Sequence, residues 1–149
     1  MIVNSPGVRS PHEKVGGIVY FGRLFDKIRR LADGKLHPDL HANLGKGFDE
    51  RAAHFLHIEY SVLQVKVQEG LSDEEVLAWS FQNGRQPGDE EIGIWNDYMR
   101  KRGWNDEVTP TLLRRLKEGG FENRTDIHTM FDFIDLDEGR DPALKTKST

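Results

Sequence analysis

The sequence predicts an all-α fold, a compact single domain of six or seven short helices. Helix start and stop signals recur along the chain, apolar residues repeat at three- and four-residue steps, and strand signals are nearly absent. A chain of 149 residues is long enough to bury one hydrophobic core. We expect an N-terminal arm over residues 1–9, the helical domain over residues 10–140 and a polar C-terminal tail over residues 141–149.

The first expected helix begins at about Ile18 and ends at Gly34. Its apolar residues have helical spacing, and Arg23 and Lys27 fall on the opposite face, which predicts that both are exposed. A turn is expected just before it at Gly16-Gly17, because each glycine inside a helix costs about 1 kcal/mol relative to alanine.

Residues 35–47 have no periodicity and are predicted to form a loop. Asp49 is expected to cap a helix that runs to Leu56. Residues 60–68 are ambiguous, since their alternation of apolar and polar residues also fits a short strand. Because Gly70 follows as a helix stop and no partner strand is evident, helix is favoured.

The second half of the chain holds four further helix signals. Ser72 and Glu75 have the spacing of a capping box, in which each side chain bonds the backbone N–H of the other. The other expected helices span residues 89–102, 109–118 and 125–136. The eight phenylalanines and the tryptophans Trp79, Trp95 and Trp104 are interpreted as core residues.

Composition excludes several classes of site. The chain has no cysteine, which rules out disulfides, thiolate nucleophiles and cysteine-ligated metal clusters. Its net charge of −4 disfavours binding to nucleic acid, because such a protein must neutralise many phosphates. No long apolar run is present, and we expect a cytoplasmic protein without a membrane partner.

Charge is distributed unevenly along the chain. Residues 1–48 carry eight bases and four acids, whereas residues 49–99 carry three bases and eleven acids. We expect these two blocks to attract one another. They are interpreted either as solvated helix faces or as a docking surface for a charged partner.

Four of the six histidines lie within 21 residues, as His37, His41, His54 and His57. With Glu50, which is one helical turn before His54, they form a candidate metal site. Imidazole and carboxylate ligands suit a transition metal, and haem is a second possibility. The spacing matches no standard metal motif, however, so charged or partly buried histidines without a ligand are the alternative.

A cluster of acids near the end of the chain is the second candidate site, for ligand binding or docking. Its members are Asp132, Asp135, Asp137, Glu138 and the neighbouring Arg140. The spacing fails the pattern of a calcium loop. Two interpretations are favoured over a calcium or magnesium site: pairing with arginines that docks the tail, or a polar pocket that faces a ligand. The arginines considered for pairing are Arg29, Arg30 and Arg140.

Several blocks of sequence are similar to a bacterial family known as a domain of unknown function. The matching blocks are Ser10-Pro11 with Glu13 and Gly16-Gly17, Ser72 through Trp79, Trp95-Asn96, Arg124-Thr125-Asp126, and Phe131 to Arg140 with its closing Asp-Leu-Asp-Glu-Gly-Arg. The resemblance covers roughly residues 10–140 and implies no catalytic residue, cofactor or substrate. His54 and His57 have no counterpart in it, so it lends the metal site no support.

No motif for nucleophilic catalysis, nucleotide binding or acid–base chemistry is present, so whether the protein is an enzyme is left open. We expect a helical module that binds a ligand or a protein partner, with self-association into a homo-oligomer. The alternatives are an enzyme that acts on a small molecule with a metal or haem at the histidine cluster, and a nucleic-acid-binding accessory protein.

Overall fold

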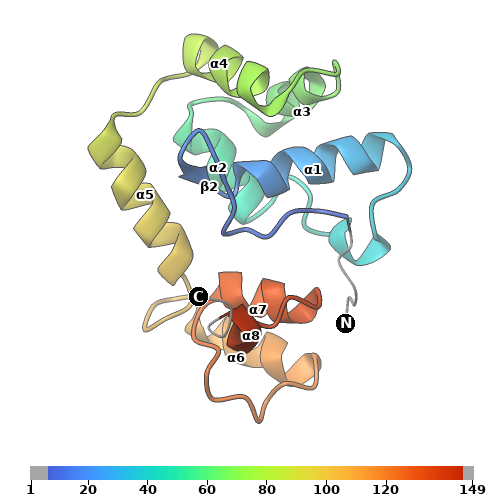
Figure 1. The fold of residues 1–149 in the computed structure, drawn as a ribbon, viewed down its shortest axis with the longest axis vertical. Helices are drawn as coiled ribbons and strands as arrows, with labels where there is room; N and C mark the ends of the chain where they lie inside the picture. Colours follow the sequence, from blue (N-terminus) through green and yellow to red (C-terminus); the bar gives the residue numbers. More distant parts are fainter. Residues whose placement is uncertain (1–6, 146–149) are drawn as a thin grey trace.

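Helices make up nearly all of the regular structure in residues 7–145 of the computed structural model, with only the backbone of Lys145 described (Figure 1). Within this range the elements in chain order are β1 (Lys14–Val15), β2 (Ile18–Val19), α1 (Phe21–Ala32), the 3-10 helix η1 (Pro38–Leu40), α2 (Phe48–Phe55), α3 (Tyr60–Val67), α4 (Asp73–Asn83), α5 (Asp89–Lys101), α6 (Thr109–Glu118), α7 (Met130–Asp137) and α8 (Pro142–Lys145). The predicted helical class is confirmed. The seven longer helices of the described range correspond to the seven expected ones.

The two-stranded sheet, the only one among residues 7–145, was missed by the sequence prediction. β1 and β2 pair antiparallel, with Lys14 opposite Val19 and Val15 opposite Ile18. Gly16 and Gly17 form the turn with φ of 58° and 80°, a left-handed backbone that a two-residue hairpin turn requires. The predicted turn is therefore correct, but two residues on each side are too few to produce an alternating pattern.

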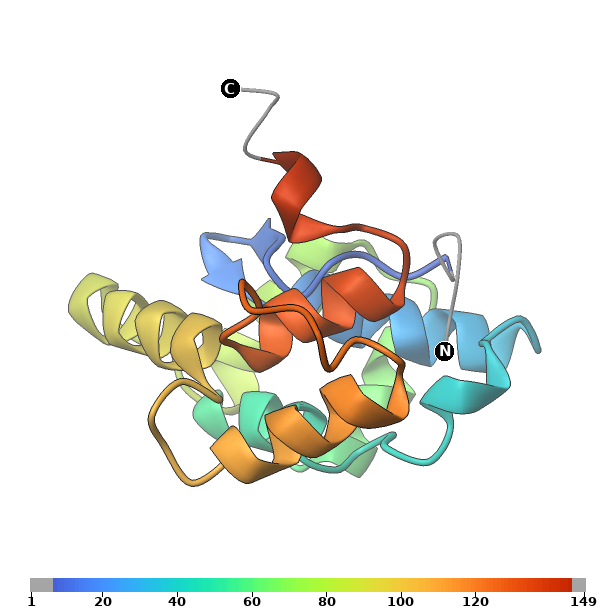
Figure 2. The same cartoon turned by 90° about the horizontal axis from the view of Figure 1, so that it is seen from below.

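The helices are stacked in tiers (Figure 1). α3 and α4 lie at one end, α1 and α2 in the middle, and α6, α7 and α8 at the other end, while α5 runs along one side and contacts both β2 and α7. The view from below in Figure 2 places α6 and α7 side by side. Within residues 7–145, every helix is too short or too polar to cross a bilayer.

Apolar side chains form two clusters. The larger one is built by the hairpin and α1 to α5, and the smaller one mainly by α6 and α7. Phe48, at the start of α2, packs against both of them. The two clusters therefore meet at one aromatic side chain.

The first half of α1 is buried on every side, which contradicts the predicted polar face. Phe21, Leu24 and Phe25 have no exposed surface, as expected, but Arg23 and Lys27 are also only 3% and 4% exposed. They are covered because the carboxylates of Glu138 and Asp49 pack onto that face of the helix.

Near the C-terminus the helix boundaries differ from the prediction. α7 begins at Met130, five residues later than expected, because the Thr129 hydroxyl accepts the N–H of Asp132 as an N-cap. Part of the predicted polar tail forms the single turn of α8. Trp104 is 56% exposed, so its assignment to the core was wrong.

Residues Val8 to Ser10, a few positions before the hairpin, are bonded to α7 and to Arg140, which follows it. The Ser10 hydroxyl donates to Asp135 at 3.0 Å, across 125 positions of sequence. Arg140 donates to the carbonyl of Val8 at 3.4 Å, and Val8 itself is buried. The two ends of the described chain are thus held in one cluster.

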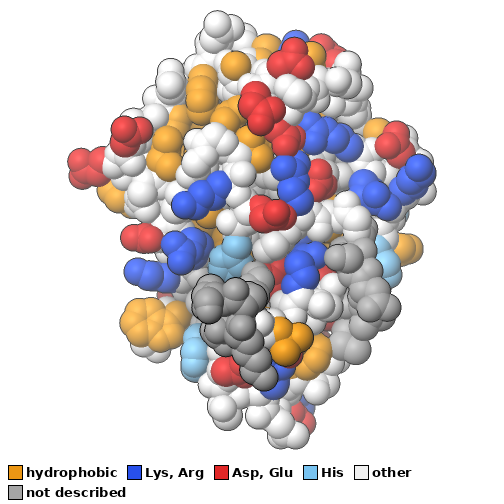
Figure 3. Space-filling view, in the orientation of Figure 1, with side chains coloured by type: hydrophobic (Ala, Val, Ile, Leu, Met, Phe, Trp, Pro, Cys, Tyr) orange, Lys and Arg blue, Asp and Glu red, His pale blue; other side chains and the backbone are white. Residues whose placement is uncertain are grey.

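Ion pairs also join the two charge blocks. Arg9 pairs with Asp26 at 2.9 Å and with Asp73 at 2.8 Å, and Arg29 reaches the same Asp73 at 2.6 Å. The expected attraction between the first and second blocks therefore has a structural counterpart. Figure 3 shows basic and acidic side chains interspersed over much of the face that is turned toward the viewer in Figure 1.

Candidate functional site

A cavity of about 310 Å³ lies between α1 and α2 on one side and α6 and α7 on the other. We call it the central cavity. Its apolar wall comes from both hydrophobic clusters, and its polar wall contains six cationic and three acidic side chains. The apolar residues include Phe48, Val108, Met130, Phe133 and Ile134; the cations are Arg23, Lys27, Lys46, Arg51, Arg102 and Arg115; the acids are Asp39, Asp137 and Glu138.

One buried ion pair closes the side of the cavity where α1 meets the end of α7. Both guanidinium NH groups of Arg23 donate to Glu138, at 2.8 and 2.6 Å, and the two side chains are 3% and 1% exposed. Arg140 donates to Glu138 as well. Burial works to lower the pKa of Arg23, but the hydrogen bond and charge of Glu138 outweigh it and raise that pKa.

A second buried group lies further along α1. Lys27 Nζ is 2.8 Å from Asp49 Oδ1, and the Tyr20 hydroxyl donates to the same oxygen at 2.6 Å. The other Asp49 oxygen accepts the backbone N–H of Gly45 at 3.0 Å, so this fully buried carboxylate is satisfied on both sides. Burial lowers the pKa of Lys27 and, together with the charge of Asp49, raises the pKa of Tyr20 well above its ordinary value.

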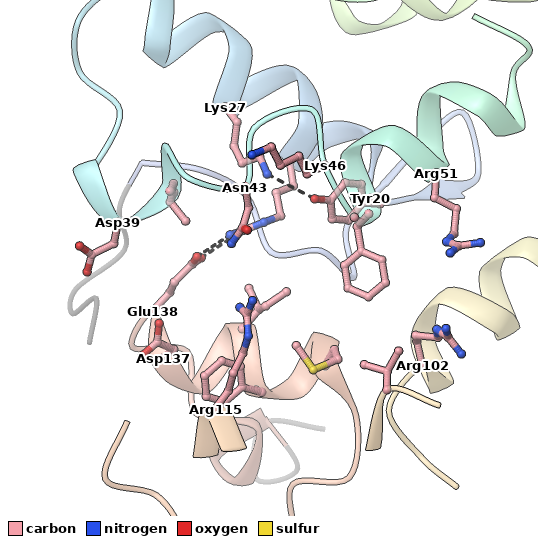
Figure 4. A pocket seen from close by; sticks show the side chains of 18 residues that line it. Tyr20, Lys27, Asp39, Asn43, Lys46, Arg51, Arg102, Arg115, Asp137 and Glu138 are labelled. Carbon is pink, nitrogen blue, oxygen red and sulfur yellow. Dashed lines mark hydrogen bonds and ion pairs between the residues drawn. The ribbon is translucent and has the colours of Figure 1, made fainter. Parts of the chain in front are cut away.

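The other cations of the cavity are open to a ligand. Arg51 of α2 and Arg102 at the end of α5 both lie over the ring of Tyr98, at 5.6 and 5.5 Å from its centre. Lys46, Arg51 and Arg115 form no ion pair with any residue between 7 and 144, and Arg102 has only Asp106 at 3.3 Å. In Figure 4, Arg115 extends upward from α6, and Arg51 reaches down from α2 above Arg102.

The structure does not bring the predicted metal ligands together. His37 Nδ1 accepts the N–H of Asp39 and caps η1, while His41 Nε2 lies 3.0 Å from the carbonyl of Leu36. The other members of the predicted set, Glu50, His54 and His57, are exposed on or just after α2. In the described range no three His, Asp or Glu side chains are arranged to hold one metal ion. The loop before α2 directs His37 and His41 to local backbone groups instead of to a shared ligand position with the residues of α2.

The C-terminal acids are distributed among separate partners. Asp135, which is fully buried, accepts from Ser10 and from Arg140 Nε at 2.9 Å. Asp132 lies 2.9 Å from His12 Nε2. Asp137 and Glu138 are the two members that line the cavity.

Of the arginines considered as partners for these acids, only Arg140 has that role. Arg29 pairs with Asp73 instead, and the Nε of Arg30 is buried without a hydrogen-bond partner among the described residues. The partner that sequence reasoning missed is Arg23, which was placed on a solvent face. Only Asp135 and Glu138 of these acids are buried, and a buried carboxylate needs a cation or other donor, which for Glu138 comes from another helix.

The chain belongs to the DUF5069 family, a domain of unknown function, whose family model matches residues 5–140. The match includes every residue that lines the central cavity. No curated protein is similar enough to the chain to count as a relative.

Proposed function

We propose that this family member is a binding module for a small anionic molecule that carries an apolar group, and that the central cavity is its site. The observation that carries the proposal is the placement of Arg51 and Arg102 over one ring, that of Tyr98. Two cations from different helices share this ring, and Arg51 has no acidic partner in the described range. An anion between the helices would offset their repulsion.

The charge of the cavity supports an anionic ligand. Cations outnumber acids two to one in its wall, although the whole chain has a net charge of −4. Of the six cations, Arg23 and Lys27 already face buried carboxylates. Of the remaining four, Arg102 pairs with Asp106, while Lys46, Arg51 and Arg115 have no ion pair within the described residues. A phosphate or carboxylate group can bind there, and guanidinium groups bind both through paired hydrogen bonds.

The apolar wall supports a ligand with a hydrophobic part. Phe48, Met130 and Phe133 face the same space as the cations, and a volume of about 310 Å³ suits a compact molecule with one ring. A ligand with both features would displace water from the apolar wall and place its charge against the arginines.

Calorimetric titration with phenyl phosphate tests the proposal, with phenol as the matched neutral compound. We expect phenyl phosphate to bind, phenol to bind far more weakly, and the affinity for phenyl phosphate to fall with rising salt. Arg51→Gln and Arg115→Gln should each weaken binding about tenfold, because each removes a charged hydrogen bond. Arg100→Gln is the control, since Arg100 is exposed on α5 and does not line the cavity.

Equal affinity for phenol and phenyl phosphate would overturn the proposal. So would a loss of affinity in Arg100→Gln as large as in the two cavity variants, because the effect would then be one of overall charge.

The expected self-association stays a prediction. Light scattering of the purified chain over a range of concentrations tests it, and a strict monomer at every concentration would count against it.

A further inference from the structure

Lys27 is the one buried lysine side chain among residues 7–144. It enters the wall of the central cavity from the second turn of α1, with its side chain 5% exposed. The other lysine of the cavity, Lys46, is exposed and comes from the loop before α2. One cavity therefore contains two primary amines in opposite environments.

The groups around Lys27 can move protons. Asp49 lies 2.8 Å from its Nζ, and the Tyr20 hydroxyl lies 3.4 Å from it while donating to Asp49 at 2.6 Å. Tyr20 has φ of 80°, a left-handed conformation that is unfavourable for a residue with a side chain. This strained backbone brings the phenol to the amine and the carboxylate, and such strain is concentrated at functional sites.

We propose that Lys27 forms an imine with an aldehyde or ketone group of an anionic ligand in the central cavity. This inference rests on the proposed function, because the open cations Arg51, Arg102 and Arg115 would hold the anionic group while the carbonyl carbon meets Nζ. It goes beyond binding by assigning a covalent step and a class of ligand.

Imine formation at Lys27 would use its two buried partners, Asp49 and Tyr20, to move protons. Asp49 takes a proton from the ammonium group, and the free electron pair of Nζ then forms a bond to the carbonyl carbon. The carbonyl oxygen takes up a proton, which the Tyr20–Asp49 pair can supply, and becomes a hydroxyl group. Loss of that hydroxyl with a further proton releases one water molecule and leaves the C=N double bond.

Two features favour this reaction at Lys27 over the other lysines. Burial lowers the pKa of Lys27, so a larger fraction of its amine is free near neutral pH. The groups at this end of the cavity are also shielded from solvent, since Tyr20 is 3% exposed and Lys27 is 4% exposed.

Pyridoxal 5′-phosphate is a suitable probe, because it combines an aldehyde, a ring and a phosphate. The wild-type protein is mixed with a substoichiometric amount at pH 7, reduced with borohydride and mapped by peptide mass spectrometry. We expect the reduced adduct mainly on Lys27, with a lower level on Lys46, because only Lys27 has the Asp49 carboxylate and the Tyr20 hydroxyl beside its amine. Labelling of Lys46 equal to or above that of Lys27 would overturn the inference, as would the absence of any adduct on Lys27.

Lys27→Arg keeps a cation for Asp49 but cannot form the imine, and it should lose the main adduct. Lys101→Arg is the matched control and should keep it, because Lys101 is exposed at the end of α5 and does not line the cavity. Because the decisive result comes from the wild-type protein, the inference stays testable even if Lys27→Arg does not fold.

Two further probes separate this inference from the proposed function. Pyridoxine 5′-phosphate has the phosphate without the aldehyde, and pyridoxal has the aldehyde without the phosphate. If pyridoxine 5′-phosphate binds but pyridoxal 5′-phosphate leaves no adduct on Lys27, the imine is refuted and the proposed function is not. Labelling of Lys27 by pyridoxal as strong as by the phosphate would support the reactive amine and refute anion recognition.

Discussion

The Arg23–Glu138 pair makes an asymmetric prediction about stability. Glu138→Gln keeps the shape of the side chain but removes the only carboxylate that Arg23 contacts in the described part of the chain. The guanidinium, which is 3% exposed, then keeps only the carbonyl of Arg9 at 3.2 Å among these contacts. An unpaired buried charge of this kind costs about 3–5 kcal/mol in the free energy of unfolding.

Arg23→Met should cost less, about 1–3 kcal/mol, because Glu138 keeps its hydrogen bond from Arg140. Combining Arg23→Met with Glu138→Gln removes both charges at once. The double variant should therefore be more stable than Glu138→Gln alone, by about 1–3 kcal/mol.

Urea unfolding followed by circular dichroism at pH 7 measures all three variants. Glu118→Gln is the control, since its pair with Arg114 is about 60% exposed on both sides and should contribute less than about 1 kcal/mol. The reasoning is refuted if Glu138→Gln costs no more than Glu118→Gln. It also fails if the double variant is as unstable as the sum of the two single ones.

Three further changes have clear expectations, each measured by urea unfolding. Gly84→Ala would place a Cβ atom 1.8 Å from the carbonyl oxygen of Leu56 and should destabilise the protein by about 3 kcal/mol; an unchanged midpoint would contradict that contact. Gly93→Ala, in open space within α5, should stabilise it by about 0.5–1 kcal/mol, and a loss of stability would show that the site is not open. Asp73 is partly buried, which works to raise its pKa, but hydrogen bonds from two arginines outweigh this and lower it. Its contribution of about 1 kcal/mol should therefore be present above about pH 4 and disappear as the pH falls further, so the difference between wild type and Asp73→Asn should shrink from pH 7 to pH 2; a constant difference would refute this.

Helix identity could be predicted from the sequence because its signals are local. The Ser72–Glu75 capping box forms as predicted, with the Ser72 hydroxyl accepting the N–H of Glu75 at 3.1 Å and the Glu75 carboxylate accepting the N–H of Ser72 at 2.9 Å. The ambiguous segment at residues 60–68 is helical, as favoured. In both places the residues within one or two helical turns were enough to predict a helix.

The candidate site could not be predicted, because it is made by packing between distant segments. Residues of α1 and α2 meet residues of α6 and α7 across about a hundred positions, and no spacing within the sequence encodes that encounter. The polar face expected for α1 was the decisive error. Helical periodicity indicates which side is apolar, but a cation on the other side is exposed only if no further element covers it.

The histidine cluster shows a different limit of reasoning from sequence spacing. Closeness in sequence suggested convergence, yet His37 and His41 bond to backbone groups of their own loop. The prediction that the acids after residue 130 pair with Arg140 is confirmed for Asp135 and Glu138. Arg23, the other partner of Glu138, lies 115 positions away in the sequence, and no local pattern links the two residues.

The hydrogen bond between Ser10 and Asp135 has a consequence for folding during translation. The segment that precedes the hairpin emerges first, but the carboxylate that it needs is synthesised among the last residues of the domain. During translation the early helices can pack around their own apolar side chains. Arg23 then has no ion-pair partner until Glu138 has been synthesised. Folding is completed only when the final turns leave the exit tunnel, so a chain that stalls before residue 130 should be a target for chaperones and proteases.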